Sequence, residues 1–71
     1  MNRDTERIVK FIDGDPSRLM TIQNLRRESN NSKDFQQEVK LFIVNILNTE
    51  KKFFDYPRDK IEIEKIAEYY F

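Results

Sequence analysis

The sequence has no cysteine and no histidine, and Gly14 is its only glycine. Without cysteine, the chain has no disulfide bonds, no thiol redox chemistry and no thiolate zinc sites. Without either residue, it has no Ser–His or Cys–His nucleophile pair and no imidazole general base. A single glycine cannot supply a phosphate-binding loop or a dinucleotide-binding fingerprint. We therefore predict a protein that is not an enzyme, uses no cofactor and takes no small-molecule substrate.

The carboxylates do not change that prediction. Glu64 and Glu68 are four residues apart on one predicted helical face, but a di-iron bundle also needs Glu-x-x-His motifs. The segment 13–15 has the acidic opening of a calcium-binding loop, yet Arg18 falls where that loop needs glycine and Asn24 where it needs glutamate. We expect solvated carboxylates and a capped turn, with no metal site.

Positive and negative charges are balanced, with 13 Lys and Arg against 13 Asp and Glu. A dedicated binder of nucleic acid or acidic membranes normally has an excess of cations. The longest apolar run, Leu41 to Val44, is far below the roughly 18 residues of a membrane span, and no signal-peptide core follows Met1. We expect a cytoplasmic protein with no membrane partner. Scarce Ala and Gly with abundant Ile, Lys and Asn are typical of AT-rich genomes, which suggests a small bacterial or phage protein.

Helix start and stop signals divide the chain into four segments within one domain, residues 1–71. Asp13-Gly14 ends the first helix, with Gly14 expected in the left-handed conformation, and Asp15-Pro16 starts the second. Asn31 or Ser32 caps the third helix, and Pro57 ends it. The predicted fold is all-α: a small, bundle-like domain of two short helices, a long central one and a C-terminal one. The first three helices span residues 4–12, 16–28 and 33–55.

The last segment carries two patterns. Ile61-Glu62-Ile63-Glu64 alternates as a strand would, whereas Ile63, Ile66 and Tyr70 recur at helical spacing. Asp59 and Glu62 also fit a capping box. A lone strand would have no partner elsewhere in this sequence, so we predict a helix.

The third predicted helix has more apolar residues than one buried stripe needs. One seam is formed by residues spaced four, three, four and seven apart: Phe35, Val39, Phe42, Ile46 and Phe53. At about 100° per residue, Leu41 and Val44 project from the opposite side, in line with Asn48. This second apolar face predicts a partner, and a second copy of the chain is the first to consider. In such a homodimer Leu41 and Val44 would pack across a two-fold axis, with Asn48 or Asn45 setting the register.

Aromatic residues are concentrated late in the chain, with eight of nine from Phe35 onward. The last five cannot all be buried in one small monomer, and exposed Tyr and Phe are common anchors at protein interfaces. We therefore predict an interaction module, a regulator or adaptor that binds another protein or itself. The predicted partner-binding residues are Leu41, Val44, Asn48, Phe54, Tyr56, Tyr69, Tyr70 and Phe71.

Nucleic-acid binding is the alternative. Arg26 and Arg27 end the second predicted helix, and Lys33 and Lys40 follow on the third, an order that a helix-turn-helix regulator permits. The simpler interpretation of the two arginines is that cations in a last turn complement the negative end of the helix.

Overall fold

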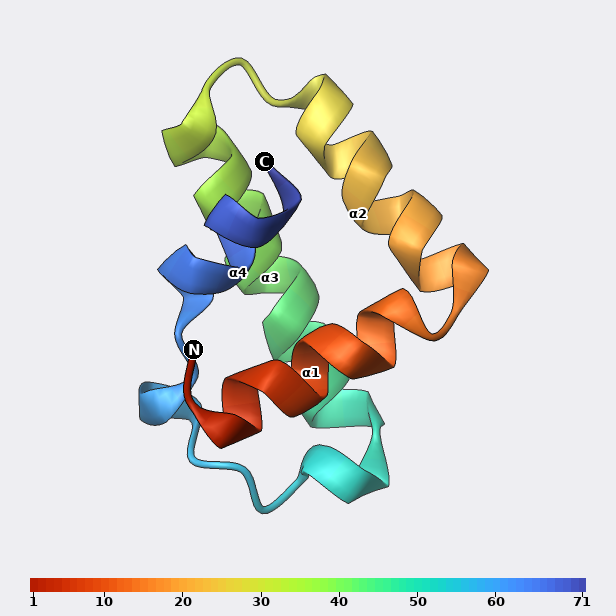
Figure 1. The fold of residues 1–71 in the computed structure, drawn as a ribbon, viewed down its shortest axis with the longest axis vertical. Coiled ribbons are helices and arrows are strands. Elements are labelled where there is room, and N and C mark those ends of the chain that lie inside the picture. The colour runs from red at the N-terminus through yellow and green to blue at the C-terminus, as the bar shows by residue number, and fades with distance from the viewer.

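The computed structural model describes all of residues 1–71 and contains four α-helices and no strand (Figure 1). The helices are α1 (Arg3–Asp13), α2 (Pro16–Glu28), α3 (Ser32–Thr49) and α4 (Ile63–Tyr70). Two short 3-10 turns, η1 (Lys51–Phe53) and η2 (Arg58–Lys60), connect α3 to α4. The prediction of an all-α domain of four helices is confirmed, including a helix at the end of the chain. None of the helices combines the length and apolarity that a membrane crossing requires.

The helices are arranged around α3. In Figure 1, α1 crosses in front of the C-terminal half of α3 and α4 crosses in front of its N-terminal half, while α2 runs along one side. Helix α4 packs on α3, and α2 contacts each of the other three helices. The last residues of the chain consequently lie between the start of α3 and α2.

Every helix contributes to one hydrophobic core. Of the predicted seam, Phe35, Val39, Ile46 and Phe53 are buried, whereas Phe42 is only half-buried. Ile43, which lay outside that seam, is fully buried. The core comprises Ile8, Val9, Ile12, Ile22, Phe35, Val39, Ile43, Ile46, Leu47, Phe53, Ile61, Ile66 and Ala67. Burial of these side chains is the main favourable contribution to folding.

Side-chain caps define three of the helix starts. The Asp15 carboxylate accepts a hydrogen bond from the Ser17 amide at 2.9 Å, and the Asn31 side chain accepts one from the Asp34 amide at 2.9 Å. Both caps were predicted from the sequence. The α1 cap, Asn2, was not; its side-chain oxygen accepts from the Thr5 amide at 2.8 Å.

The start of α1 is also tied to the segment before α4. The Asn2 side-chain amide donates to the Lys60 carbonyl at 2.7 Å, and the buried Thr5 hydroxyl accepts from the Glu62 amide at 3.1 Å. The Glu62 carboxylate accepts from the Asn2 amide. Glu62 is the residue before α4, but its side chain makes no helix cap, so the predicted capping box with Asp59 is wrong. The carboxylate is already engaged by Asn2.

The third helix is shorter than predicted, because it ends at Thr49 and not near Asp55. The next residue, Glu50, is extended, with φ −97° and ψ 111°. Its carboxylate accepts a hydrogen bond from Arg18 at 3.0 Å. Phe53 then turns back into the core and meets the Phe11 ring edge-on at 5.1 Å. These tertiary contacts break the helix at a point where no Pro or Gly marks an end.

Gly14 does not adopt the left-handed conformation that was predicted, since its φ is −76° and its ψ −7°. Glycine instead provides space at this position. A Cβ atom there would lie 3.1 Å from the Lys10 carbonyl oxygen, tighter than ordinary van der Waals contact. A larger residue at position 14 would therefore require a shift of a few tenths of an ångström in the last turn of α1.

Candidate interaction surface at the end of α4

Six large apolar side chains are exposed: Met1, Met20, Leu41, Phe54, Tyr69 and Phe71. Two of them, Tyr69 and Phe71, lie where three surface hollows meet around the end of α4. One hollow separates α3 from α4, one separates α2 from the end of α4, and one separates α1 from α4. Tyr69 and Phe71 each line two of these hollows. The end of α4 thus combines exposed rings with adjoining concave walls.

Asp13, the last residue of α1, positions both tyrosines. Tyr70 donates its hydroxyl to Asp13 at 2.6 Å and Tyr69 donates to the same carboxylate at 3.0 Å. The two rings meet edge-on with centroids 4.8 Å apart. Burial, followed by the bond to Asp13, raises the pKa of Tyr70, and the bond to Asp13 raises the pKa of Tyr69. Both hydroxyls therefore remain protonated and able to donate at neutral pH.

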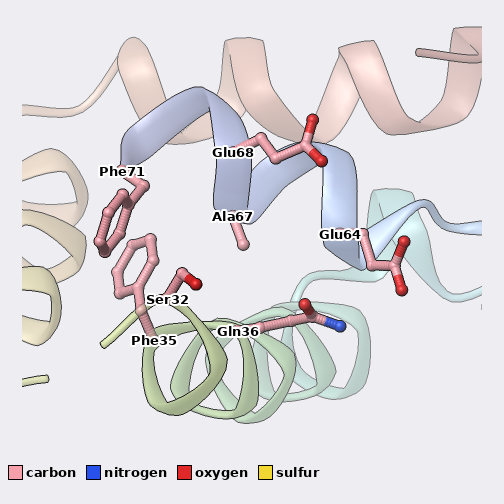
Figure 2. Close-up of a pocket in the computed structure, with 7 residues that line it drawn as sticks. All are labelled: Ser32, Phe35, Gln36, Glu64, Ala67, Glu68 and Phe71. Atoms are coloured by element: carbon pink, nitrogen blue, oxygen red, sulfur yellow. The ribbon is translucent and has the colours of Figure 1, made fainter. Parts of the chain in front are cut away.

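Phe71 rests on α3 and α2 at once. Its ring centroid lies 5.9 Å from that of Phe35, and the Arg26 guanidinium lies 5.1 Å from the same centroid. Arg26 Nε also donates to the main-chain oxygen of Phe71. In Figure 2 the Phe71 and Phe35 rings face each other at one end of the groove, and Gln36 and Glu64 mark its polar end. The Phe71 side chain is 52% exposed, so these contacts orient the ring without covering it.

Arg27 lies beside Arg26 without a carboxylate partner. The only ion pairs in the molecule are those of Arg18 with Asp15 and Glu50. The hollow between α2 and the end of α4 has a volume of about 540 Å³ and no carboxylate among its lining residues. We call it the C-terminal surface, and its residues are Gln23, Arg26, Arg27, Tyr69, Tyr70 and Phe71.

The structure thus brings together two groups of residues that sequence analysis assigned to different functions. Tyr69, Tyr70 and Phe71 were predicted to bind protein, whereas Arg26 and Arg27 belonged to the nucleic-acid alternative. Lys33 and Lys40, the other members of that alternative, are exposed on α3 and line none of the hollows at the end of α4.

The outer face of α3 offers less apolar area than the sequence suggested. Leu41, at 65%, is the only exposed large apolar side chain of α3. Val44 is half-buried, and the Asn48 side chain already accepts a hydrogen bond from Arg58. Single exposed apolar residues are ordinary on soluble proteins. Leu41, Val44 and Asn48 therefore form no extensive apolar patch.

The remaining predicted partner-binding residues lie near η1. Phe54 is exposed, and Tyr56 is half-buried with its ring edge-on to Phe53 at 4.9 Å. Neither lines a hollow with Tyr69 or Phe71. The eight predicted residues are consequently distributed over three separate parts of the surface.

Two contributors to the C-terminal surface were missed. Gln23 has a usable signal, because it precedes Arg26 and Arg27 by three and four residues and so shares their side of α2. Asp13 has no such signal, because Tyr69 and Tyr70, which donate to it, follow it in the sequence by 56 and 57 residues. No cluster of three carboxylates lies close enough to bind a metal ion together.

Comparisons with family models, with curated proteins and with solved structures give no match for this chain. The candidate surface therefore rests on its own geometry.

Proposed function

We propose that this chain is a small non-enzymatic interaction module, a regulator or adaptor that binds another protein through the C-terminal surface. The observation that carries the proposal is the convergence of the exposed Tyr69 and Phe71 rings with Arg27, which has no ion-pair partner. Tyrosine and arginine are the residue types most enriched where interfaces concentrate their binding energy. Aromatic rings bury large areas at small entropic cost.

The chemistry of the surface defines the partner segment. Arg27 has no ion-pair partner and therefore favours an acidic side chain, which arginine binds in a bidentate manner. The exposed faces of Tyr69 and Phe71 favour an apolar side chain next to it. The proposed partner is therefore a protein segment that presents an acidic residue beside an apolar one.

The surface is already held in shape before a partner arrives. Asp13 fixes the two tyrosine hydroxyls, and Arg26 with Phe35 fixes the Phe71 ring. Side chains that are ordered in advance lose less conformational entropy on binding. This preorganisation supports the C-terminal surface over the outer face of α3.

Self-association through Leu41 and Val44 has weaker geometric support. A stable interface buries about 800 Å² on each partner. Leu41 is the one exposed large apolar residue that α3 contributes toward such an area. Sedimentation velocity at high micromolar concentration tests this version, and a monomer would remove it.

The proposal is tested by capture of partners from the native host with matched variants. Arg27→Glu reverses one unpaired charge and Tyr69→Ser removes one exposed ring, so each is expected to abolish capture of a specific protein. Lys40→Glu and Leu41→Asp make comparable changes on α3 and are expected to leave capture intact. Capture that survives Arg27→Glu and Tyr69→Ser but is lost with Leu41→Asp would refute the C-terminal surface.

A photo-reactive phenylalanine analogue at position 69 or 41 gives a direct reading of the contact. Cross-linking to the captured protein is expected from position 69 and not from position 41. Retention on duplex DNA that Arg26→Ala combined with Arg27→Ala removes, in the absence of a captured protein, would transfer these arginines to the nucleic-acid alternative.

A further inference from the structure

A second concave site lies on the other side of α1, between that helix and η1. It is a hollow of about 370 Å³, which we call the basic hollow. Its residues are Arg7, Lys10, Phe11, Lys52, Phe53 and Tyr56. All three of its charged residues are cations, although the chain as a whole has no net charge.

The aromatic residues form the rigid part of the basic hollow. Phe53 meets Phe11 edge-on at 5.1 Å and Tyr56 edge-on at 4.9 Å, so the three rings pack in an unbroken row. Phe53 is buried in the core and anchors that row. The wall against which the cations lie is therefore continuous with the folded interior.

Two of the three cations, Lys52 and Arg7, contact these aromatic residues. The Lys52 ammonium lies 4.2 Å from the Phe11 centroid and 5.4 Å from that of Phe53. Arg7 donates to the Tyr56 hydroxyl at 3.5 Å. Neither cation has a carboxylate oxygen within ion-pair distance, because Arg18 makes the only ion pairs.

Arg18 engages two acidic residues beside Phe11, and Asp4 acts only weakly on Arg7. Arg18 lies over the Phe11 ring at 4.0 Å, and it occupies both Asp15 and Glu50. Hydrogen bonding to Tyr56 is the largest cause that raises the pKa of Arg7, and Asp4 is the smallest. None of the three cations in the hollow forms an ion pair, so their positive charge is available to attract an anion.

We infer that the basic hollow binds the phosphate group of a phosphorylated small ligand, with Arg7 and Lys52 as its principal contacts. A phosphate monoester carries about −1.5 to −2 charges and three acceptor oxygens at neutral pH, which suits three cations better than a carboxylate with one charge. The aromatic wall holds the two principal contacts in place before the anion arrives. The site goes beyond the proposed function, and none of its residues belongs to the C-terminal surface.

The test is an NMR titration of the whole chain at low ionic strength with inorganic phosphate, adenosine monophosphate, adenosine and acetate. Amide shifts around Arg7 and Lys52 are expected from inorganic phosphate or the monophosphate at up to about 10 mM. A stronger response to the monophosphate assigns the site to nucleotides, and an equal response assigns it to free phosphate. Absence of any local shift with both phosphates, or equal shifts with acetate or adenosine, would overturn the inference.

Matched variants locate the binding. Arg7→Gln and Lys52→Gln are each expected to weaken binding by about tenfold, since each removes a charged donor to the anion. Lys10 is left unchanged because it also borders Glu6 and Asp13 in the neighbouring hollow. Lys40→Gln removes one exposed cation from α3 and is expected to have no effect. A loss with Lys40→Gln equal to that with Lys52→Gln would show nonspecific attraction and refute the site.

Discussion

Two leucines of α3 allow the same substitution to be compared in two environments. Leu47 is 2% exposed and belongs to the core, whereas Leu41, six residues earlier, is 65% exposed. Both lie inside the helix, so replacement by alanine changes intrinsic helix propensity about equally at the two sites. The difference between the two variants therefore reports burial alone.

We expect Leu47→Ala to lower the free energy of unfolding by about 2–5 kcal/mol, the range for buried leucines that leave a cavity. Leu41→Ala should change it by less than about 0.5 kcal/mol, as exposed positions do. A chain of 71 residues has roughly 4–11 kcal/mol of stability in total, so Leu47→Ala removes a large fraction of it.

Urea unfolding followed by circular dichroism measures both values, with each variant studied at two protein concentrations tenfold apart. In a monomer the unfolding midpoint is independent of concentration, whereas in a dimer it rises with concentration. If Leu41→Ala costs as much as Leu47→Ala, and the wild-type midpoint rises with concentration, Leu41 is buried between two copies. That result would refute our assignment of α3's outer face to solvent.

Three further predictions concern single contacts. Because the folded pKa of Tyr70 is raised, its contribution to the free energy of unfolding should be fully present below the ordinary tyrosine pKa of about 10 and should be lost as pH rises above it. Asp13→Asn should shift tyrosinate formation, measured by ultraviolet absorbance, to lower pH. Gly14→Ala should change the free energy of unfolding by less than about 1 kcal/mol in thermal unfolding. Its φ is negative, and the close contact with Lys10 offsets the gain from a less flexible unfolded chain. A loss above about 2 kcal/mol would indicate a left-handed residue. Asn31→Ala should cost about 1 kcal/mol through loss of the α3 cap, while Asn30→Ala, which removes no cap, should be neutral in the same unfolding experiment.

Local signals predicted the parts of the fold that depend on neighbouring residues. Asp15 and Pro16 place the start of α2, and Asn31 places the start of α3, because a cap acts over two or three residues. The end of α3 could not be predicted in this way. It is set by the hydrogen bond from Arg18 to Glu50 and by the packing of Phe11 on Phe53. These two pairs are separated in the sequence by 32 and 42 positions.

The sequence predicted that an aromatic surface exists but not where on the fold it lies. Composition alone indicated that the late aromatic residues exceed what one small core can bury. Which of them gather was decided by Asp13, which fixes Tyr69 and Tyr70, and by Arg26, which lies on Phe71. Helical periodicity correctly assigned Leu41 to the outside of α3 but could not show that Val44, one turn away, is half-buried.

The hydrogen bonds that tie Asn2 and Thr5 to residues 60–62 join the two extremes of the chain. The bonded residues are separated by 57 or 58 positions, so the start of α1 cannot be fixed until residues 60–62 have left the ribosome. Closing so large a loop costs conformational entropy, and the hydrogen bonds offset this cost only once the loop is closed. Contacts between α1 and α2 involve earlier residues, so they can form before the start of α1 is fixed.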